Sequence, residues 1–201
     1  MIALIDYGVG NLRSVNKALR AAGAEVTQTD VPEIILRARK VVLPGVGAFQ
    51  DGMQGLIKRD LVPVLKKIVE KQTPLLGICL GMQLFFEHSS ERGQTVGLGF
   101  LPGKVAKFSS TQLTIPQTGW NQLQIIKPSP LLAGIETGTY VYFNHSYYCA
   151  PADQEDTLAQ TEYGQRYASA VEQGNLYGVQ FHPEKSQKVG ISILKNFVER
   201  C

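Results

Sequence analysis

Short apolar runs that end in glycine-containing turns constrain this fold more than any other feature of the sequence. Residues 2–5, 40–43 and 74–78 are almost entirely apolar, so each predicts a strand buried on both faces. Apolar residues at helical spacing occur in residues 12–22, after a capping Asn11, and in residues 60–71. Such alternation is typical of a parallel sheet covered by helices on both faces.

The second half of the chain has a different pattern. Short strand-like runs separated by turns predict a mainly antiparallel region, with a hairpin turn at residues 173–175. These runs are residues 104–108, 121–126, 140–143, 146–150, 157–163, 167–173 and 176–180, and a helix is expected at 188–199. Neither a linker nor a repeat interrupts the chain. We therefore expect one domain over residues 1–201, of the α/β class, with a mainly parallel central sheet flanked by helices and an antiparallel extension.

Charge and cysteine usage exclude several classes of function. The chain has 20 basic and 17 acidic residues, a net charge of +3 without a basic cluster, which argues against nucleic-acid binding. Its three cysteines are far apart and form no CxxC pair, so neither a disulfide framework nor a metal site is expected, and no cofactor is predicted. No apolar run approaches the ~20 residues of a membrane span. A reduced, cytoplasmic protein fits these features best.

A cysteine between two glycines follows the apolar run at 74–78. Gly77-Ile78-Cys79-Leu80-Gly81 resembles a strand–turn–helix nucleophile elbow with a thiol in place of the usual hydroxyl. We expect a helix, including the apolar residues 84–86, to start directly after the turn, and its dipole would favour the thiolate. The alternative is a small buried residue at a strand end, because free cysteines are often only packed in a core.

A cysteine nucleophile needs a base, and the chain has three histidines. His88 is expected on the helix after the elbow, at the surface, and His145 could line a site or satisfy a turn. His182 ends an apolar strand and precedes Pro183-Glu184. Proline favours an extended conformation in the preceding residue, so Glu184 could lie beside the imidazole and orient it.

Three motifs together resemble those of the class I, triad-type glutamine amidotransferases. They are residues 44–47 (Pro-Gly-Val-Gly), residues 77–83 and residues 182–184, and they occur in the order that the family shows. Residues 5–12, 44–49, 119–121 and 182–186 narrow the resemblance to glutaminase subunits of histidine biosynthesis. Two positions differ from that pattern: Gln117 stands where histidine is expected, and Asn144 where valine is expected.

The resemblance implies a role for each motif residue. Cys79 would attack the side-chain amide of L-glutamine, His182 would transfer protons, and Glu184 would orient His182. The oxyanion donors would be the Leu80 N–H and the backbone of Val46 and Gly47. The substrate pocket would comprise Gln83, His145, Ser146 and Tyr147. A solvent-facing helix residue is the alternative interpretation of Gln83.

The resemblance also implies a partner, because nothing in this chain resembles a site for a phosphorylated ribonucleotide. A cyclase subunit with a (β/α)8 barrel would form a heterodimer with this chain and receive ammonia through a channel. Trp120, Asn121 and Lys185 are the candidates for the docking face, although Trp120 could equally be a core residue. Weak glutaminase activity is expected from the isolated chain.

Three other interpretations compete with this one. The chain could be the glutaminase of an anthranilate or aminodeoxychorismate synthase, which share the triad but usually lack the motifs at residues 6–8 and 119–121. It could be a non-enzymatic regulatory module on the same fold, against which the intact triad argues. It could also be a cysteine peptidase, against which Gln83 and the loop at 44–47 argue more weakly.

Overall fold

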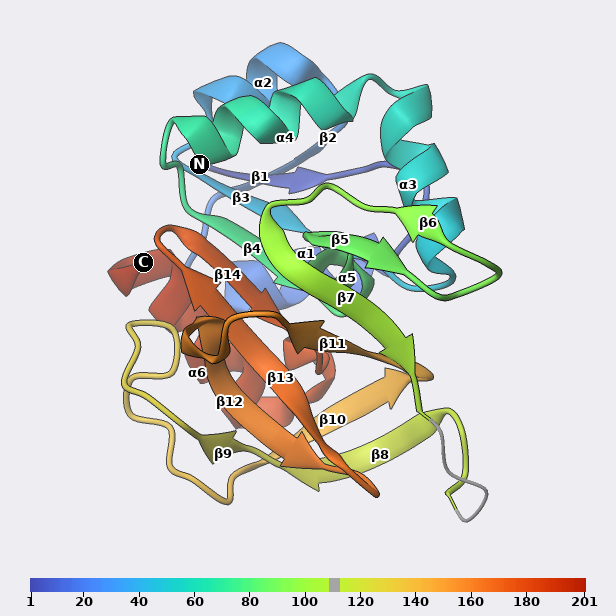
Figure 1. The fold of residues 1–201 in the computed structure, drawn as a ribbon. Helices are drawn as coiled ribbons and strands as arrows, with labels where there is room; N and C mark the ends of the chain where they lie inside the picture. The colour runs from blue at the N-terminus through green and yellow to red at the C-terminus, as the bar shows by residue number, and fades with distance from the viewer. Residues whose placement is uncertain (109–112) are drawn as a thin grey trace.

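The computed structural model describes residues 1–108 and 113–201, and within them one large mixed sheet organises the molecule (Figure 1). Its strands run in the order β2-β1-β3-β4-β14-β13-β11-β7-β5-β6, and the first five are mutually parallel. These five are β1 (Ile2–Ile5), β2 (Val26–Thr29), β3 (Lys40–Leu43), β4 (Leu75–Ile78) and β14 (Leu176–Val179). The parallel sheet predicted from the apolar runs is confirmed.

The rest of the sheet is largely antiparallel, as the second half of the sequence predicted. It contains β5 (Phe86–Ser89), β6 (Thr95–Val96), β7 (Leu101–Lys107), β11 (Tyr147–Pro151) and β13 (Arg166–Gln173), with β9 (Gln124–Ile125) and β12 (Thr157–Glu162) joined through β13. Among the described strands of this part, only β5 and β7 form a parallel pair. A separate two-stranded sheet pairs β8 (Gln117–Gln122) with β10 (Tyr140–His145).

The hairpin between β13 and β14 joins the two parts. Gln173 pairs with Leu176 across the predicted turn, and β14 then runs parallel to β4. The last strand of the sequence therefore lies in the middle of the sheet, beside the strand that precedes Cys79. Residues about 100 positions apart in the chain meet at this point.

Helices cover both faces of the parallel strands (Figure 1). One face carries α1 (Leu12–Ala21) and α6 (Gln187–Arg200), and the other carries α2 (Pro32–Arg37), α3 (Phe49–Lys58) and α4 (Leu61–Glu70). The sequence predicted α1, α4 and α6 but neither α2 nor α3. Two glycines weaken the helical signal of α3, and one of them, Gly55, is required there because a Cβ would lie 2.4 Å from the Tyr7 carbonyl oxygen.

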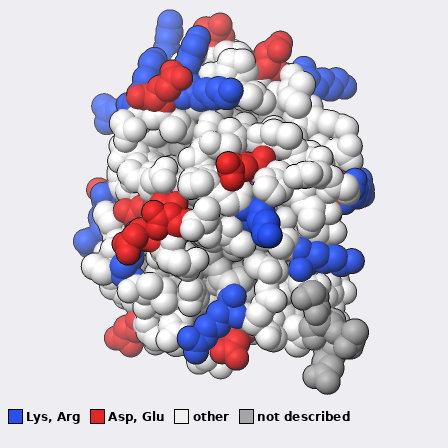
Figure 2. Space-filling model, in the orientation of Figure 1, with Lys and Arg blue, Asp and Glu red and all other residues white. Residues whose placement is uncertain are grey.

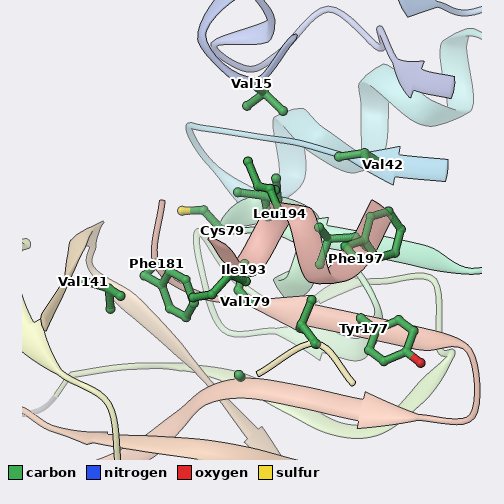
Figure 3. Close-up of a cluster of buried hydrophobic side chains, with 14 of the residues drawn as sticks. Val15, Val42, Cys79, Val141, Tyr177, Val179, Phe181, Ile193, Leu194 and Phe197 are labelled. Atoms are coloured by element: carbon green, nitrogen blue, oxygen red, sulfur yellow. The ribbon is translucent and has the colours of Figure 1, made fainter. Parts of the chain in front are cut away.

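Two hydrophobic clusters fill the spaces between the sheet and these helices. The cluster under α1 and α6 contains Val15, Leu19 and Leu194, and Cys79 lies at its margin (Figure 3).

All three cysteines are free thiols. Among the described residues, no helix combines the length and hydropathy that a membrane span requires. The face in Figure 2 carries basic and acidic side chains interspersed rather than a basic stripe.

The prediction of a longer helix after the elbow is wrong. The helix α5 comprises only Leu80–Gln83, and the chain continues almost at once into β5, so His88 lies in a strand rather than on a helix. Leu84, Phe85 and Phe86 are all completely buried. A short apolar run that is buried on every side carries no periodicity that distinguishes a helix from a strand, which explains the error.

Candidate active site

Cys79 occupies a strained turn at the carboxyl end of β4. Its φ is +53° and its ψ is −107°, a combination that few non-glycine residues adopt, and its N–H donates to the Val179 carbonyl at 2.7 Å. Both flanking glycines are sterically required. A Cβ on Gly77 would lie 2.6 Å from the Phe85 ring, and one on Gly81 would lie 1.8 Å from the Leu43 carbonyl oxygen. The turn thus forms only with glycine at both positions.

The loop at residues 44–47 is held against this turn by Tyr7. The Tyr7 hydroxyl donates to the Pro44 carbonyl at 2.6 Å, and a Cβ on Gly45 would lie 2.3 Å from the Tyr7 hydroxyl oxygen. Gly47 has a φ of +104°. This loop leads into α3, whose first N–H, on Phe49, donates to the Glu91 carboxylate at 2.7 Å. The backbone of residues 44–47 is therefore fixed at both of its ends.

His182 and Glu184 form a buried pair beside the elbow. Their side chains are 2% and 1% exposed, and the His182 Nδ1 lies 2.8 Å from Glu184 Oε1. His182 is extended, as expected before proline, but residues 183–185 form a 3-10 turn rather than the continued extended chain of the prediction. Glu184 reaches the imidazole through that turn.

The second ring nitrogen of His182 is available for the thiol. Nε2 is buried and makes no hydrogen bond of ordinary geometry to any described residue. Burial disfavours a charged imidazole and lowers the pKa of His182. The interactions with Cys79 and with Glu184 outweigh this effect, and the net result is a pKa of His182 raised to about 10. These interactions stabilise the protonated form of the His182 imidazole.

A cavity of about 300 Å³ opens over Cys79. It brings together eight of the residues predicted for the site: Val46, Gly47, Cys79, Leu80, Gln83, His145, Ser146 and Tyr147. Glu91, Pro116 and Asn144 complete its lining. His182 and Glu184 do not line the cavity but lie buried next to it. Polar groups from both parts of the sheet therefore converge on a space of the size of an amino acid.

Gln83 is buried, so the alternative of a solvent-facing helix residue does not hold. Its amide nitrogen donates to the Tyr147 carbonyl and to Gln180 Oε1, both at 3.0 Å. The His145 Nδ1 lies 2.7 Å from the same Tyr147 carbonyl, so this nitrogen is the donor. Burial lowers the pKa of His145 to about 4, with a smaller contribution from the His182 charge, and the ring is neutral at pH 7.

The predicted docking residues lie on a different surface, around the β8–β10 sheet. Trp120 is 46% exposed and packs edge-on against Tyr142, and the Lys185 ammonium lies 5.4 Å from the centre of the same ring. Asn121 is the next residue along β8, so it faces the other way, and its amide donates to the Glu162 carbonyl at 2.9 Å. Trp120 and Lys185 thus share one surface that does not include the Asn121 side chain.

This surface is connected to the buried pair by the backbone. The His182 N–H donates to the Tyr142 carbonyl at 2.8 Å, and the Ser186 hydroxyl accepts from the Tyr142 N–H at 3.0 Å and donates to the His182 carbonyl at 2.7 Å. Tyr142 therefore lies between the surface of Trp120 and Lys185 on one side and His182 on the other.

Three polar residues at the site were not predicted as site residues: Gln180, Glu91 and Asn144. Gln180 is completely buried, and its amide nitrogen lies 3.6 Å from the Cys79 sulfur. It stands two residues before His182, where an extended chain directs side chains to one face, so this spacing was a usable signal. Glu91 lines the cavity from a turn after β5, and its local sequence contains no signal that would have identified it.

The comparisons with known proteins agree with this geometry. A family model described as glutamine amidotransferase class-I matches residues 3–201, so the chain belongs to the class I glutamine amidotransferase family. The chain is 50% identical over 198 residues to "Imidazole glycerol phosphate synthase subunit HisH" of Moorella thermoacetica, covering 98% of this chain and 94% of that protein. It is 48% identical to the protein of the same name from Geobacillus kaustophilus, with 98% and 96% covered.

The solved structures extend the agreement to the fold. A crystal structure of a glutamine amidotransferase superposes with a TM-score of 0.76 at 17% sequence identity, covering 98% of this chain and 100% of that one. At so low an identity the likeness concerns the fold alone. The predicted fold class and family are confirmed, and the curated relatives are named as subunits of a synthase.

Proposed function

We propose that this chain is the glutaminase subunit of imidazole glycerol phosphate synthase, and that it hydrolyses L-glutamine and passes the ammonia to a cyclase subunit. The observation that carries the proposal is the convergence of Cys79, in its strained turn, with the buried His182–Glu184 pair under a cavity of about 300 Å³. The near-full-length similarity to proteins named as subunits of that synthase supports the choice of substrate.

In the first step the Cys79 thiolate attacks the side-chain amide carbon of glutamine. A tetrahedral intermediate forms, its C–N bond breaks, and a γ-glutamyl thioester remains on the sulfur. His182, protonated because its pKa is raised to about 10, donates its proton to the leaving nitrogen, so that ammonia departs as a neutral molecule. His182 then accepts a proton from water, which hydrolyses the thioester to glutamate.

Glu184 supports this proton transfer through the other ring nitrogen. Its carboxylate accepts from Nδ1 at 2.8 Å, which fixes the ring orientation and leaves Nε2 for the reaction. Because both side chains are almost fully buried, water does not compete for this hydrogen bond. Glu184 therefore acts as a positioning residue.

Backbone groups would stabilise the oxyanion. Leu80 is the first residue of α5, so its N–H has no partner within the helix and is available beside the sulfur. The backbone of Val46 and Gly47 forms another part of the cavity wall and would supply the second donor. Removing one donor of this kind typically costs about 3–4 kcal/mol of transition-state stabilisation.

The cavity offers partners for each end of the substrate. Gln83, His145, Ser146 and Tyr147 form one wall of the cavity and would hold the bound glutamine. Glu91 contributes a carboxylate, whose charge suits the α-ammonium group of glutamine.

The partner would dock on the surface that carries Trp120 and Lys185. A half-exposed tryptophan packed on a tyrosine is the type of anchor that dominates binding energy in protein interfaces. We extend the proposal to a cytoplasmic heterodimer with a (β/α)8-barrel cyclase, and to one glutaminase domain over the whole chain. Hydrogen bonds join the Tyr142 backbone to His182 and Ser186. A shift of Tyr142 when the partner docks would therefore move the segment that carries the catalytic pair.

The deciding experiment measures glutamate release by the purified chain with and without the cyclase subunit and its nucleotide ligand. We expect weak activity alone and strong stimulation in the complex. Cys79→Ala should abolish both, a loss of about 10⁴-fold or more, because no other group can form the thioester. The same variant should leave ammonia-dependent synthesis by the complex intact. Stimulated glutaminase activity in Cys79→Ala would disprove the mechanism.

A further inference from the structure

Gln180 is a polar side chain in contact with the Cys79 sulfur that the proposed mechanism does not use. It directly follows β14, is completely buried, and directs its amide nitrogen to within 3.6 Å of the Cys79 sulfur. Its amide oxygen accepts from Gln83 at 3.0 Å. A fully buried amide in contact with a nucleophilic sulfur calls for a physical explanation.

The orientation of this amide follows from one backbone carbonyl. The Tyr147 carbonyl can only accept, so the Gln83 atom that lies 3.0 Å from it must be the NH2 group. The same NH2 group lies 3.0 Å from one atom of the Gln180 amide, which must therefore be the oxygen. The remaining atom of that amide, which faces the sulfur, is the nitrogen. Gln180 is thus a hydrogen-bond donor to Cys79.

We propose that Gln180 is a catalytic donor that selects and orients the Cys79 thiolate. A donor stabilises the thiolate relative to the thiol, because only the charged sulfur is a good acceptor. If the amide turned over to accept from an S–H group, Gln83 would lose its acceptor and present its NH2 group to another NH2 group. The Gln83 contact therefore locks Gln180 in the orientation that favours the anion.

The other titratable groups near the sulfur cannot replace this donor. Tyr7 follows β1, Tyr167 lies in β13 and Cys149 lies in β11. Burial and, to a smaller extent, the charge of Cys79 raise the pKa of each of these groups, so all three are neutral at pH 7. His182 supplies the positive charge from the segment after β14, and Glu184 lies behind it. Gln180 adds a neutral, fixed donor whose effect does not change with pH.

The inference rests on the proposed role of Cys79 as nucleophile, but it is tested by the ionisation of the sulfur and not by turnover. The full-length chain is treated with iodoacetamide between pH 5 and 10, and the labelling rate of the peptide that contains Cys79 is followed by mass spectrometry. Gln180→Glu keeps the shape and the acceptor for Gln83 but replaces the donor by an acceptor. Gln180→Met removes both functions. Gln117→Leu is the control, because this equally buried amide contacts Tyr167 and not the sulfur.

We expect the midpoint of the labelling profile to rise by about one pH unit in Gln180→Met, and by more in Gln180→Glu, where a carboxylate faces the thiolate. Gln117→Leu should leave the midpoint unchanged. In glutamine hydrolysis, kcat should fall about 10–100-fold in Gln180→Met while KM changes less than about threefold. A midpoint that does not move in a cooperatively folded Gln180 variant would overturn the inference.

A measurement on the wild-type chain covers the case in which the variants do not fold. With ¹⁵N-labelled glutamine, one buried side-chain NH2 pair should shift with the same pH midpoint as the labelling of Cys79; if none does, the assignment is wrong. The two proposals fail separately. A shifted midpoint in a chain that does not hydrolyse glutamine would refute the function alone, and hydrolysis with an unshifted midpoint would refute the role of Gln180 alone.

Discussion

The two parts of the sheet contribute to the site in different ways. The parallel part supplies Cys79 and the loop at residues 44–47, and both are positioned by close approaches that leave no space for a side chain. Gly45 lies against the Tyr7 side chain, and Gly81 lies against the Leu43 backbone. The antiparallel part supplies Tyr147, and the separate β8–β10 sheet supplies His145, and both residues are positioned by hydrogen bonds and aromatic contacts. The site lies at the ends of β4 and β14, the two parallel strands nearest to the antiparallel part, which begins at β13.

This difference leads to different expectations for substitutions. Where the backbone of one segment touches that of another, an added methyl group displaces a whole segment, and the cost is large. Where side chains hold one another, a substitution removes one hydrogen bond or contact and the cost is smaller.

Gly81→Ala should abolish the folded elbow. Its Cβ would lie 1.8 Å from the Leu43 carbonyl oxygen, so β3 and α5 would have to separate, and we expect a loss of about 4 kcal/mol or more in the free energy of unfolding. Urea titration monitored by circular dichroism measures this loss. Gly47→Ala is the matched control. Its Cβ would meet no atom of the described residues within 4 Å, so only the strain of a φ of +104° remains, about 1–3 kcal/mol. Equal stability of Gly81→Ala and the wild type would contradict the steric argument.

Glu184→Gln should leave the fold intact and reduce kcat by about 10³–10⁴-fold, because the Gln amide no longer selects the tautomer and charge of His182 that the reaction needs. Steady-state glutaminase assays of the complex measure this effect, and KM should change little. The carboxylate raises the pKa of His182, so its removal should also move the basic limb of the pH profile to lower pH. A basic limb that stays in place would show that Glu184 does not act on His182.

Trp120→Ala should weaken the complex with the cyclase subunit about 10–100-fold, since a partly exposed aromatic anchor is lost. Isothermal titration calorimetry measures the affinity. The labelling rate of Cys79 in the isolated chain should remain unchanged, because Trp120 does not line the cavity. Ile126→Ala, at another exposed apolar residue, serves as the control. If both variants bind the partner as tightly as the wild type, the docking surface lies elsewhere.

His145→Gln should change the acid stability of the chain by a smaller amount. Burial lowers the pKa of His145 from 6.5 to about 4, so the unfolded state binds the proton more readily, and the stability that is present above pH 6.5 is lost as the pH falls toward 4. Between pH 6 and pH 5 this residue alone should cost about 1 kcal/mol. Urea unfolding at both pH values should show a smaller decrease in the variant. An identical decrease would mean that His145 is not buried in its neutral form.

The predictions from sequence were most accurate where the signal is local. The apolar runs of β1, β3 and β4 predicted the parallel sheet, and the glycines around Cys79 predicted the turn, because both are patterns within a few consecutive residues. The atom that requires glycine at position 81, the Leu43 carbonyl oxygen, is distant in the sequence and was not predicted. The helix after the elbow was predicted too long, since Phe85 and Phe86 are buried on all sides and show no periodicity. Glu91 was not predicted, because its contact with Phe49 bridges 42 positions of the chain.

The sequence was sufficient to predict the strands of the parallel sheet, the glycine-flanked turn at Cys79 and the class I glutamine amidotransferase family, because periodicity, glycine positions and short motifs are local properties. The tertiary structure was needed to place β14 beside β4, which brings Gln180 and His182 to the sulfur from about 100 residues away. It also decided that Trp120 and Asn121 face opposite sides of β8. Strand order and side-chain facing depend on which distant surfaces bury each other, and that choice is made by the packing of the whole chain.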